Sequence, residues 1–384
     1  MNLKKKNISK IYKSPSKVLF CKKCVISNQR PRIKLNQDGI CNACINADNK
    51  YKINWPEREK ELKDLLSKYR KKNGKFDVIV PSSGGKDSAV VAYLLKYKYN
   101  MNPLTVTWAP NIYTDIGYQN FQGLIQSGFT NILGTPNGIA HRKLVRESLI
   151  EIGDPFQPFI YGQVSFPIKT ALQYNISLIM DGENGELEYG GDNNASKKSF
   201  SSKDEIKYWF SNFEASKWIK KGFTKKDMEI YMPPPRQEVF KKKITRKFWS
   251  YYNFWDPQEH YYFATKNTKF KPNPDGRSEG TYSKYASLDD AIDGFHFYFM
   301  YLKFGIGRAT SDAAHEIRDR HLSREEGVKL VKKYDGEFPK KYFQTFLEYC
   351  SLTKKDFFKI CDRWRADHLW KKINNKWILK NKII

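Results

Sequence analysis

The sequence has no apolar run long enough to cross a membrane. A membrane-spanning helix needs about 20 consecutive apolar residues, whereas the longest candidate, Phe295–Leu302, is short, aromatic and typical of a protein core. The basic start at Met1–Lys6 is not followed by an apolar stretch, which argues against a secretory signal. These absences predict a cytoplasmic protein without a membrane segment.

Acidic residues are scarce relative to basic ones. Asp and Glu number 41, Lys and Arg 68, among 384 residues, which gives a net charge of +27. The basic residues stand singly or in short runs such as Lys241–Lys243, so no basic tail is set apart from the fold. The charge favours an anionic partner or substrate, but it does not distinguish RNA from a nucleotide-linked molecule. Hydrophobic residues (40%) suffice for a sizeable core, and the length suggests two or three domains of roughly 150 residues each.

Cysteine is absent between Cys44 and Cys350, and the isolated Cys350 and Cys361 are predicted to be buried thiols. The other four form two Cys-x-x-Cys pairs with sixteen residues between them, a spacing typical of a tetrahedral zinc site: Cys21, Cys24, Cys41 and Cys44. Disulfides and a redox pair are the alternatives, but a reducing cytosol disfavours disulfides and a redox motif needs only one pair. Four thiolates leave zinc no open position, so its role is predicted to be structural.

Short apolar runs alternate with helical stretches from residue 76 onward. Strands are predicted at 76–80, 104–108, 132–133 and 176–180, and helices at 89–98, 121–127 and 141–150. This alternation predicts an α/β fold with a parallel sheet, whose ligands bind at the carboxyl ends of the strands. The predicted organisation is a zinc module at 1–50, a linking helix within 51–74, a nucleotide-binding domain at 75–200 and an aromatic, basic and then helical part at 201–384. Residues 190–204 are predicted to form a loop, and helical periodicity runs from Ala286 to the end.

The strongest chemical motif follows the first predicted strand. Residues 81–88, hereafter the glycine loop, read Pro-Ser-Ser-Gly-Gly-Lys-Asp-Ser and lead into a helix. A glycine pair between strand and helix lets backbone N–H groups approach a phosphate at the positive end of the helix dipole. Lys86 adds a positive charge, and Asp87 can hold a magnesium ion against phosphate oxygens. The predicted nucleotide-binding residues of this loop are Ser83, Gly84, Gly85, Lys86, Asp87 and Ser88.

Two other interpretations of the glycine loop fit its residues less well. It is not a Walker A loop, because Val80 stands where that motif needs its first glycine and Asp87 where it needs Ser or Thr. A plain strand-to-helix turn is the alternative, which the strand–loop–helix context disfavours.

The segment Ser-Gly-Gly-Lys-Asp-Ser resembles the pyrophosphate loop of the N-type ATP pyrophosphatases, the PP-loop superfamily. Further motifs resemble the N-acetyl sugar amidotransferases of that superfamily, and they span most of the chain. They are Cys-Lys-Lys-Cys-Val-Ile-Ser at 21–27, Asp-Gly-Ile-Cys-Asn-Ala-Cys at 38–44, Thr-Pro-Asn-Gly at 135–138, Gly-Asp-Pro-Phe-Gln-Pro-Phe at 153–159, the glycine- and glutamate-rich stretch at 182–191, Gly-Arg-Ala-Thr-Ser-Asp at 307–312 and Arg-Glu-Glu at 324–326.

The resemblance implies an adenine nucleotide alpha-hydrolase-like fold and an ATP-dependent reaction that converts an acetamido group into an acetamidino group. The implied substrates are N-acetylated, nucleotide-linked sugars of lipopolysaccharide O-antigen or of pseudaminic and legionaminic acid synthesis. ATP and Mg²⁺ would take part, and the products would be AMP and pyrophosphate. The chemistry agrees with the residues, because resonance makes an amide carbonyl a poor electrophile and adenylation of its oxygen creates a leaving group.

Such a reaction needs a source of ammonia. The chain has Asn2 where an N-terminal cysteine nucleophile would stand, and it has no Gly-x-Cys-x-Gly motif, so no glutaminase is recognisable in it. The resemblance implies a separate glutaminase subunit (HisH-like) with a cyclase-like subunit (HisF-like), similar to those of histidine biosynthesis.

Other candidates follow predicted strands. Glu183 and Glu186 are candidate catalytic residues that could bind magnesium or orient ammonia, and Asn184 could hold a substrate hydroxyl or amide; a solvated glycine-rich turn is the alternative. Trp108 could stack on adenine or belong to the core. Thr135 could touch the nucleotide, although a Pro-Asn-Gly turn alone explains it.

Four polar residues near the C-terminus share a predicted helix and are candidate substrate ligands: Arg308, Asp312, His315 and Arg318. They could clamp a sugar carboxylate or a nucleotide diphosphate, and a solvated charged face is the alternative. His141, beside two basic residues, is interpreted as a surface histidine.

The sequence therefore predicts an ATP-dependent amidotransferase that acts on an N-acetylated nucleotide sugar. The alternative is a tRNA-modifying PP-loop enzyme, either a thiolase or a lysidine-type ligase, for which the net charge of +27 would serve RNA. The lack of cysteine between Cys44 and Cys350 argues against a thiolase, which commonly uses thiols or an iron–sulfur cluster in its ATP domain. A non-catalytic zinc-dependent interaction module is a third possibility, which the intact glycine loop disfavours. A nucleic-acid partner is not expected.

Overall fold

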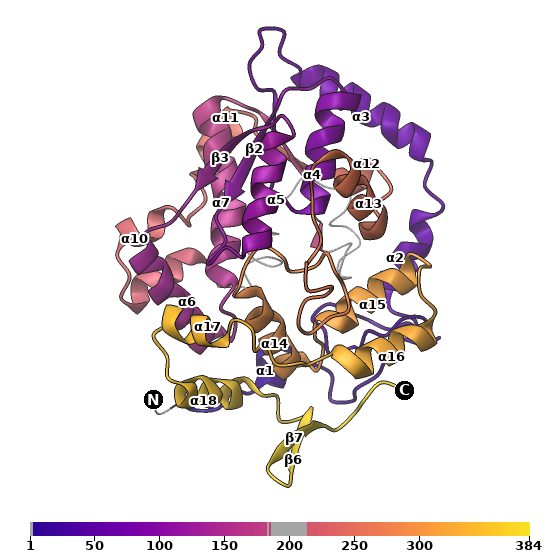
Figure 1. Ribbon diagram of the computed structural model, residues 1–384, viewed down its shortest axis with the longest axis vertical. Helices are drawn as coiled ribbons and strands as arrows, with labels where there is room; N and C mark the ends of the chain where they lie inside the picture. The colour runs from indigo at the N-terminus through magenta and orange to yellow at the C-terminus, as the bar shows by residue number, and fades with distance from the viewer. Residues whose placement is uncertain (1–2, 183, 186–212) are drawn as a thin grey trace.

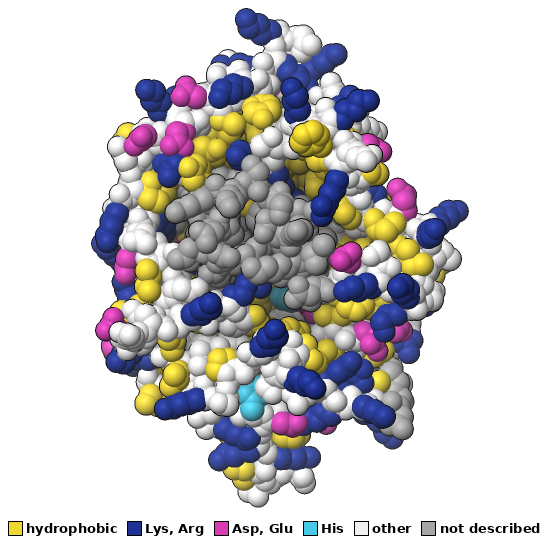
Figure 2. All heavy atoms as spheres, turned by 180° about the vertical axis from the view of Figure 1, so that it is seen from behind, with side chains coloured by type: hydrophobic (Ala, Val, Ile, Leu, Met, Phe, Trp, Pro, Cys, Tyr) yellow, Lys and Arg dark blue, Asp and Glu magenta, His cyan; other side chains and the backbone are white. Residues whose placement is uncertain are grey.

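A computed structural model describes residues 3–182, 184–185 and 213–384 (Figure 1). Glu183, Glu186 and the predicted loop at 190–204 lie outside the described residues. Within the described part, the chain has no helix that combines the length and the apolar character of a membrane span. Lys and Arg side chains are scattered over the face of the molecule shown in Figure 2.

A sheet of five parallel strands forms the centre of the fold, in the order β3-β2-β1-β4-β5. The strands are β1 (Val78–Pro81), β2 (Pro103–Trp108), β3 (Thr130–Gly134), β4 (Leu178–Asp181) and β5 (Thr245–Phe248). The β-branched run Val78–Val80 is fully buried, as expected of a parallel strand covered on both faces. The predicted α/β class with a parallel sheet is confirmed. β5 was not predicted, because Thr-Arg-Lys-Phe contains no apolar run.

Alternating side chains of the strands pack against helices on opposite faces. Val78 and Val80 share a core with α3 (Trp55–Tyr69), with α4 (Lys86–Tyr93) and with α5 (Asp115–Gln126). Ile79 points the other way, into a core with α7 (Gln157–Tyr174). A short π-helical turn, η1 (Leu94–Lys98), continues α4, and α6 (Gly138–Ile152) follows β3. α7 was not predicted, because Pro158 and the internal Pro167 read as helix breakers.

The N-terminal cysteines share one hydrophobic core with the C-terminal helices rather than with the sheet. This core contains Cys21 and Cys24, Phe295 and Phe299 of α14, and Phe357 of α18. Besides α6, the helices that contribute to it are α1 (Ile8–Tyr12), α2 (Asn42–Lys50), α14 (Asp293–Phe304), α15 (Arg308–Arg318), α16 (Arg324–Tyr334), α17 (Phe343–Tyr349) and α18 (Lys354–Trp364). Residues from the two ends of the chain thus lie side by side, as the indigo α2 and the orange α15 show in Figure 1.

Short helices connect these two parts: η4 (Ala215–Lys221), α10 (Lys225–Glu229), α11 (Arg236–Lys241), α12 (Trp249–Tyr252) and α13 (Pro257–Asn267). The chain ends in an antiparallel hairpin of β6 (Trp370–Ile373) and β7 (Lys376–Leu379). Asn374 and Asn375 form its turn with φ values of 46° and 61°, the left-handed pair that a type I′ turn requires. The prediction that helical periodicity continues to the end is therefore wrong for the last residues.

Candidate active site

The glycine loop leaves β1 at its carboxyl end and enters α4. The Ser82 and Ser88 hydroxyl groups lie 2.8 Å apart, and the Gly84 N–H donates to Ser82 Oγ at 3.3 Å. The N-cap residue of α4 is Gly85, and no side chain accepts a hydrogen bond there, so N–H groups of the first turn can donate to a ligand. The residue after β4 also packs closely against the glycine loop, because a Cβ atom at Gly182 would stand 3.0 Å from the Ser88 backbone. These contacts fix the loop as a backbone-lined concavity suited to an anion.

Gly84 is the position at which this loop tolerates no side chain. Its φ is +91°, and a Cβ atom there would lie 2.7 Å from the backbone of Asn120 in α5. The sequence predicts that the glycine loop binds ATP, so Gly84→Ala, which displaces the loop from α5, should abolish detectable ATP binding in a calorimetric titration. Gly74→Ala is the matched control, because Gly74 also has a positive φ (+73°) but has nothing within 4 Å of the added Cβ. Equal ATP affinity in the two variants would contradict this use of the loop.

The Asp87 carboxylate is held from two sides. Lys86 forms an ion pair with one oxygen, and His260 of α13 lies 2.7 Å from the other through Nδ1. Burial raises the pKa of Asp87, but the charge of Lys86 and the hydrogen bond from His260 outweigh it and lower that pKa to about 2. A magnesium ion bound to Asp87, as predicted, would thus have to displace Lys86 or His260 from the carboxylate or bind beside them. His260 was not foreseen, because it lies 173 residues away in an aromatic stretch without a motif.

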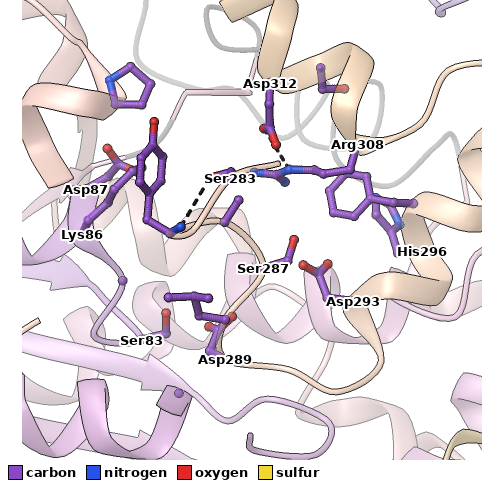
Figure 3. A pocket seen from close by; sticks show the side chains of 18 of the residues that line it. Ser83, Lys86, Asp87, Ser283, Ser287, Asp289, Asp293, His296, Arg308 and Asp312 are labelled. Carbon is purple, nitrogen blue, oxygen red and sulfur yellow. Dashed lines mark hydrogen bonds and ion pairs between the residues drawn. The ribbon is translucent and has the colours of Figure 1, made fainter. Parts of the chain in front are cut away.

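A cavity of about 370 Å³ opens in front of the glycine loop, within the size range of small-molecule sites (Figure 3). Ser83, Lys86 and Asp87 form one side. The opposite side comes from the C-terminal helices and from the segment before them, and it includes Ser283, Ser287, Asp293, His296, Arg308 and Asp312, whereas Asp289 of that segment lies next to Ser83. The cavity therefore joins the loop to residues more than 190 positions further along the chain.

Charged groups on that opposite side are arranged in pairs. Arg308 and Asp312 form an ion pair of 3.0 Å, and the Arg308 guanidinium lies 4.6 Å from the centre of the Phe297 ring. His296 Nδ1 lies 2.8 Å from a carboxylate oxygen of Asp154. Burial lowers the pKa of His296, but the Asp154 charge outweighs it and raises that pKa. Arg308, Asp312 and His315, which the sequence predicts, all line the cavity.

A short acidic segment precedes α14 and reaches the glycine loop. Asp289 accepts a hydrogen bond from the Ser83 side chain, and burial together with the Asp293 charge raises the pKa of Asp289. Asp290 anchors the segment, because it accepts from the Asn111 backbone N–H at 2.6 Å. The residues Asp289, Asp293 and His296 were missed in the sequence, although the Asp-Asp-x-x-Asp spacing before a helix was a visible signal.

Several predicted site residues lie away from the cavity. Trp108 is 4% exposed and packs against Phe166 and Tyr231 in the core. Thr135 is exposed and Asn184 is buried, and neither lines the cavity in the described part of the chain.

His141 corrects an expectation, because it is not at the surface. Its side chain is 3% exposed, and its two ring nitrogens lie 2.7 Å from Tyr231 Oη and from Asn111 Oδ1. Burial lowers the pKa of His141 to about 4. The adjacent basic residues misled the prediction, since they face outward from a helix whose other face is buried.

The four N-terminal cysteines form one compact cluster. Cys21 Sγ lies 3.9 Å from Cys44 Sγ, and Cys24 Sγ lies 3.8 Å from Cys41 Sγ. All four sulfur atoms lie within 4.8 Å of one another and are buried, and the spacing is too long for disulfides. Backbone N–H groups of Cys24 and Cys44 donate to the Cys21 and Cys41 sulfurs at 3.4 Å, which favours thiolates. The cluster can hold a tetrahedral zinc ion. Cys350 and Cys361 are buried free thiols, as predicted.

Parts of the chain are similar to known proteins. Residues 279–383 match the family model of the LPS biosynthesis protein WbpG-like, C-terminal domain. A stretch of 88 residues is 38% identical to an uncharacterized protein of Methanocaldococcus jannaschii and covers 22% of this chain and 31% of that protein. The chain thus spans less than a third of that relative's length. The first match links the C-terminal part to surface-sugar biosynthesis, and it includes the cavity residues Asp289, Asp293, His296 and Arg308.

Proposed function

We propose that this protein is an ATP-dependent amidotransferase that converts the acetamido group of an N-acetylated, nucleotide-linked sugar into an acetamidino group. One observation carries the proposal: a single cavity is lined by the glycine loop on one side and by residues of the WbpG-like segment on the other. The loop suits the phosphates of ATP, and the matched segment belongs to a family of surface-sugar biosynthesis. A shared cavity is what transfer between ATP and a sugar requires.

The proposed reaction balances as two steps. The acetamido oxygen attacks the α-phosphorus of ATP, and the bond to the β-phosphate oxygen breaks to release pyrophosphate. Ammonia then adds to the activated carbon, the carbon–oxygen bond breaks, and AMP departs with the former carbonyl oxygen. Loss of a proton leaves the amidine. No covalent intermediate on the protein is needed, so the protein contributes binding and charge stabilisation.

The residues around the cavity fit these tasks. The N–H groups of the glycine loop and the Lys86 ammonium would stabilise the departing pyrophosphate. Asp87, fixed by His260, holds Lys86 in position. The acceptor sugar would occupy the opposite side, near Asp293, His296 and Arg308. A magnesium ion would neutralise phosphate charge when bound, with Asp87 as its proposed ligand.

The test incubates the purified protein with ATP, Mg²⁺, ammonium and a UDP-linked N-acetyl sugar, with unmodified tRNA as a parallel acceptor. We expect AMP and pyrophosphate in equal amounts and a sugar in which an imino group replaces an oxygen atom by mass. Formation of ADP, or modification of tRNA instead of the sugar, would refute the proposal. A thiolation is distinguishable, because sulfur makes the product heavier.

The nitrogen donor gives a separate prediction. We propose that a glutaminase partner with a cyclase-like subunit supplies ammonia in the cell, since the chain has no recognisable glutaminase. The isolated protein should therefore use ammonium and leave glutamine unused. The measurement compares amidine formation with each donor after free ammonium has been removed enzymatically from the glutamine stock. Turnover with glutamine alone would contradict this expectation.

A further inference from the structure

A single short helix joins the cysteine cluster to the cavity. α15 begins with Arg308 in the cavity wall and ends with Arg318, which is 7% exposed. Burial lowers the pKa of the Arg318 guanidinium, but the neighbouring side chains of Cys24, Cys41 and Cys44 outweigh burial and raise that pKa. Of the four polar residues that the sequence placed on this helix, Arg318 is thus the one that faces the cluster and not the cavity. Because the helix is only about 15 Å long, a shift at one end moves the other.

A second connection runs through α2. The helix begins next to Cys41, its N-cap, and ends at Lys50. The Lys50 ammonium lies 2.6 Å from a carboxylate oxygen of Asp319, the residue that caps the C-terminus of α15, and it donates to the Trp255 carbonyl at 2.8 Å. Trp255 lines the cavity. Side-chain exposures of 18% for Lys50 and 5% for Asp319 show that solvent screens this pair only weakly.

The cysteine module also reaches the cavity directly. Arg30, between the two cysteine pairs in sequence, is one of the lining residues. Burial lowers the pKa of His315 well below its usual value, and the charges of Arg318, Arg308 and Arg30 lower it further. His315 is therefore neutral near pH 7, so the cationic side chains at this end of the cavity are Arg30 and Arg308, which stand beside the carboxylates of Asp312 and Glu316. An anionic group, either a phosphate or a carboxylate, is the ligand that arginine recognises best.

We infer that the metal-loaded cysteine cluster holds in place the side of the cavity at which the acceptor sugar is proposed to bind, with Arg318 and Lys50 as positioning residues. Arg30 would contact an anionic group of that acceptor. Four thiolates around a divalent ion carry net negative charge, which the buried Arg318 guanidinium balances. Without the ion the four sulfur atoms lose their common ligand, so α15, which shares a core with them, loses its anchor. In naming an acceptor, the inference rests on the proposed function.

Hydrogen exchange of the full-length protein tests the anchor without any substrate. Zinc-loaded protein is compared with protein stripped by a chelator, and exchange is read by mass spectrometry in peptides of α15 and of α4. We expect exchange in α15 to rise by about tenfold or more on stripping, while α4 stays protected. Unchanged exchange in α15 would overturn the inference, and so would an equal rise in α4, because the metal would then support the whole fold.

Variants that keep the cysteines separate the anchor from metal loss. Arg318→Met should raise exchange in α15 while the zinc content stays near one ion per chain. Lys329→Met, an exposed change on the neighbouring α16, is the control and should leave α15 unaffected. If Arg318→Met leaves α15 as protected as in the unmodified protein, Arg318 is not a positioning residue.

Kinetics test the proposed contact of Arg30. Arg30→Gln should raise the KM for the nucleotide sugar by about tenfold or more, the scale of one charged hydrogen bond, with little change in kcat. Arg32→Gln is the matched control, because Arg32 belongs to the same module and does not line the cavity in the described residues. An unchanged KM in Arg30→Gln would overturn this assignment. Failure of the proposed function would appear instead as absent AMP formation by the unmodified protein, with the exchange results unaffected.

Discussion

Replacing Cys41 with alanine is expected to abolish zinc binding by the cysteine cluster and to destabilise the C-terminal helices as well as the N-terminal module. The reason is the shared core, in which the four cysteines pack with Phe295, Phe299 and Phe357. Structural zinc contributes about 10–16 kcal/mol in small zinc-dependent domains, which is comparable with the whole stability of an ordinary domain, about 5–15 kcal/mol. We expect zinc content to fall to near zero and the melting temperature to drop by more than about 10 °C.

The matched control for this variant is Cys361→Ala. Cys361 is fully buried in the same core but lies outside the cluster. The same atoms are removed, so the control measures the loss of packing alone, typically about 1 kcal/mol. Zinc content is measured by atomic emission and melting by circular dichroism. If Cys41→Ala and Cys361→Ala lower the melting temperature equally, the cluster does not stabilise the fold through a metal.

The sequence predicted the sheet well where strands carry apolar runs. Val78–Val80 and the run at 104–108 are β-rich and fully buried, so periodicity alone locates them. β5 was not predicted, because its position is set by pairing with β4 and its less buried residues are Thr and Lys. α7 was not predicted for another reason: it contains an internal proline, for which packing against β1 and β2 compensates. Tertiary context decided both elements.

The site was predictable only as far as its local motifs. The glycine loop and the cysteine pairs are contiguous patterns, and the structure places each of them as a compact group. The rest of the site is assembled from distant segments, so no spacing rule brings Arg30 to the cavity or His260 to Asp87. The side chains on α15 show the limit: helical spacing put four polar residues on one helix, but only packing decides that Arg318 faces the cysteines.

Changing Asp87 to asparagine is expected to lower the rate of AMP formation by a factor of about 10²–10³, the usual effect of losing one preorganised charge. Asparagine keeps the shape of the side chain, but it lacks the charge that holds Lys86. Its NH₂ group would also face either Lys86 or His260, which are both hydrogen-bond donors to Asp87. Breaking a buried ion pair also costs stability, about 3–5 kcal/mol. Rates are therefore compared at a temperature at which both proteins are folded, with zinc content as the check.

The control and the pH dependence distinguish this role from a merely structural one. Asp115 also lies in the first turn of its helix, α5, but is exposed, so Asp115→Asn should leave the rate within about twofold. The pKa of Asp87 is lowered from 3.8 to about 2, so its stabilising contribution is complete above pH 3.8 and is lost as the pH falls toward 2. The rate profile should then show no ionisation of Asp87 between pH 5 and 9. A carboxylate that is charged throughout this interval can act only by its constant charge. An apparent pKa in the rate profile that shifts between pH 5 and 9 in Asp87→Asn would therefore contradict the assignment, and so would an unchanged rate.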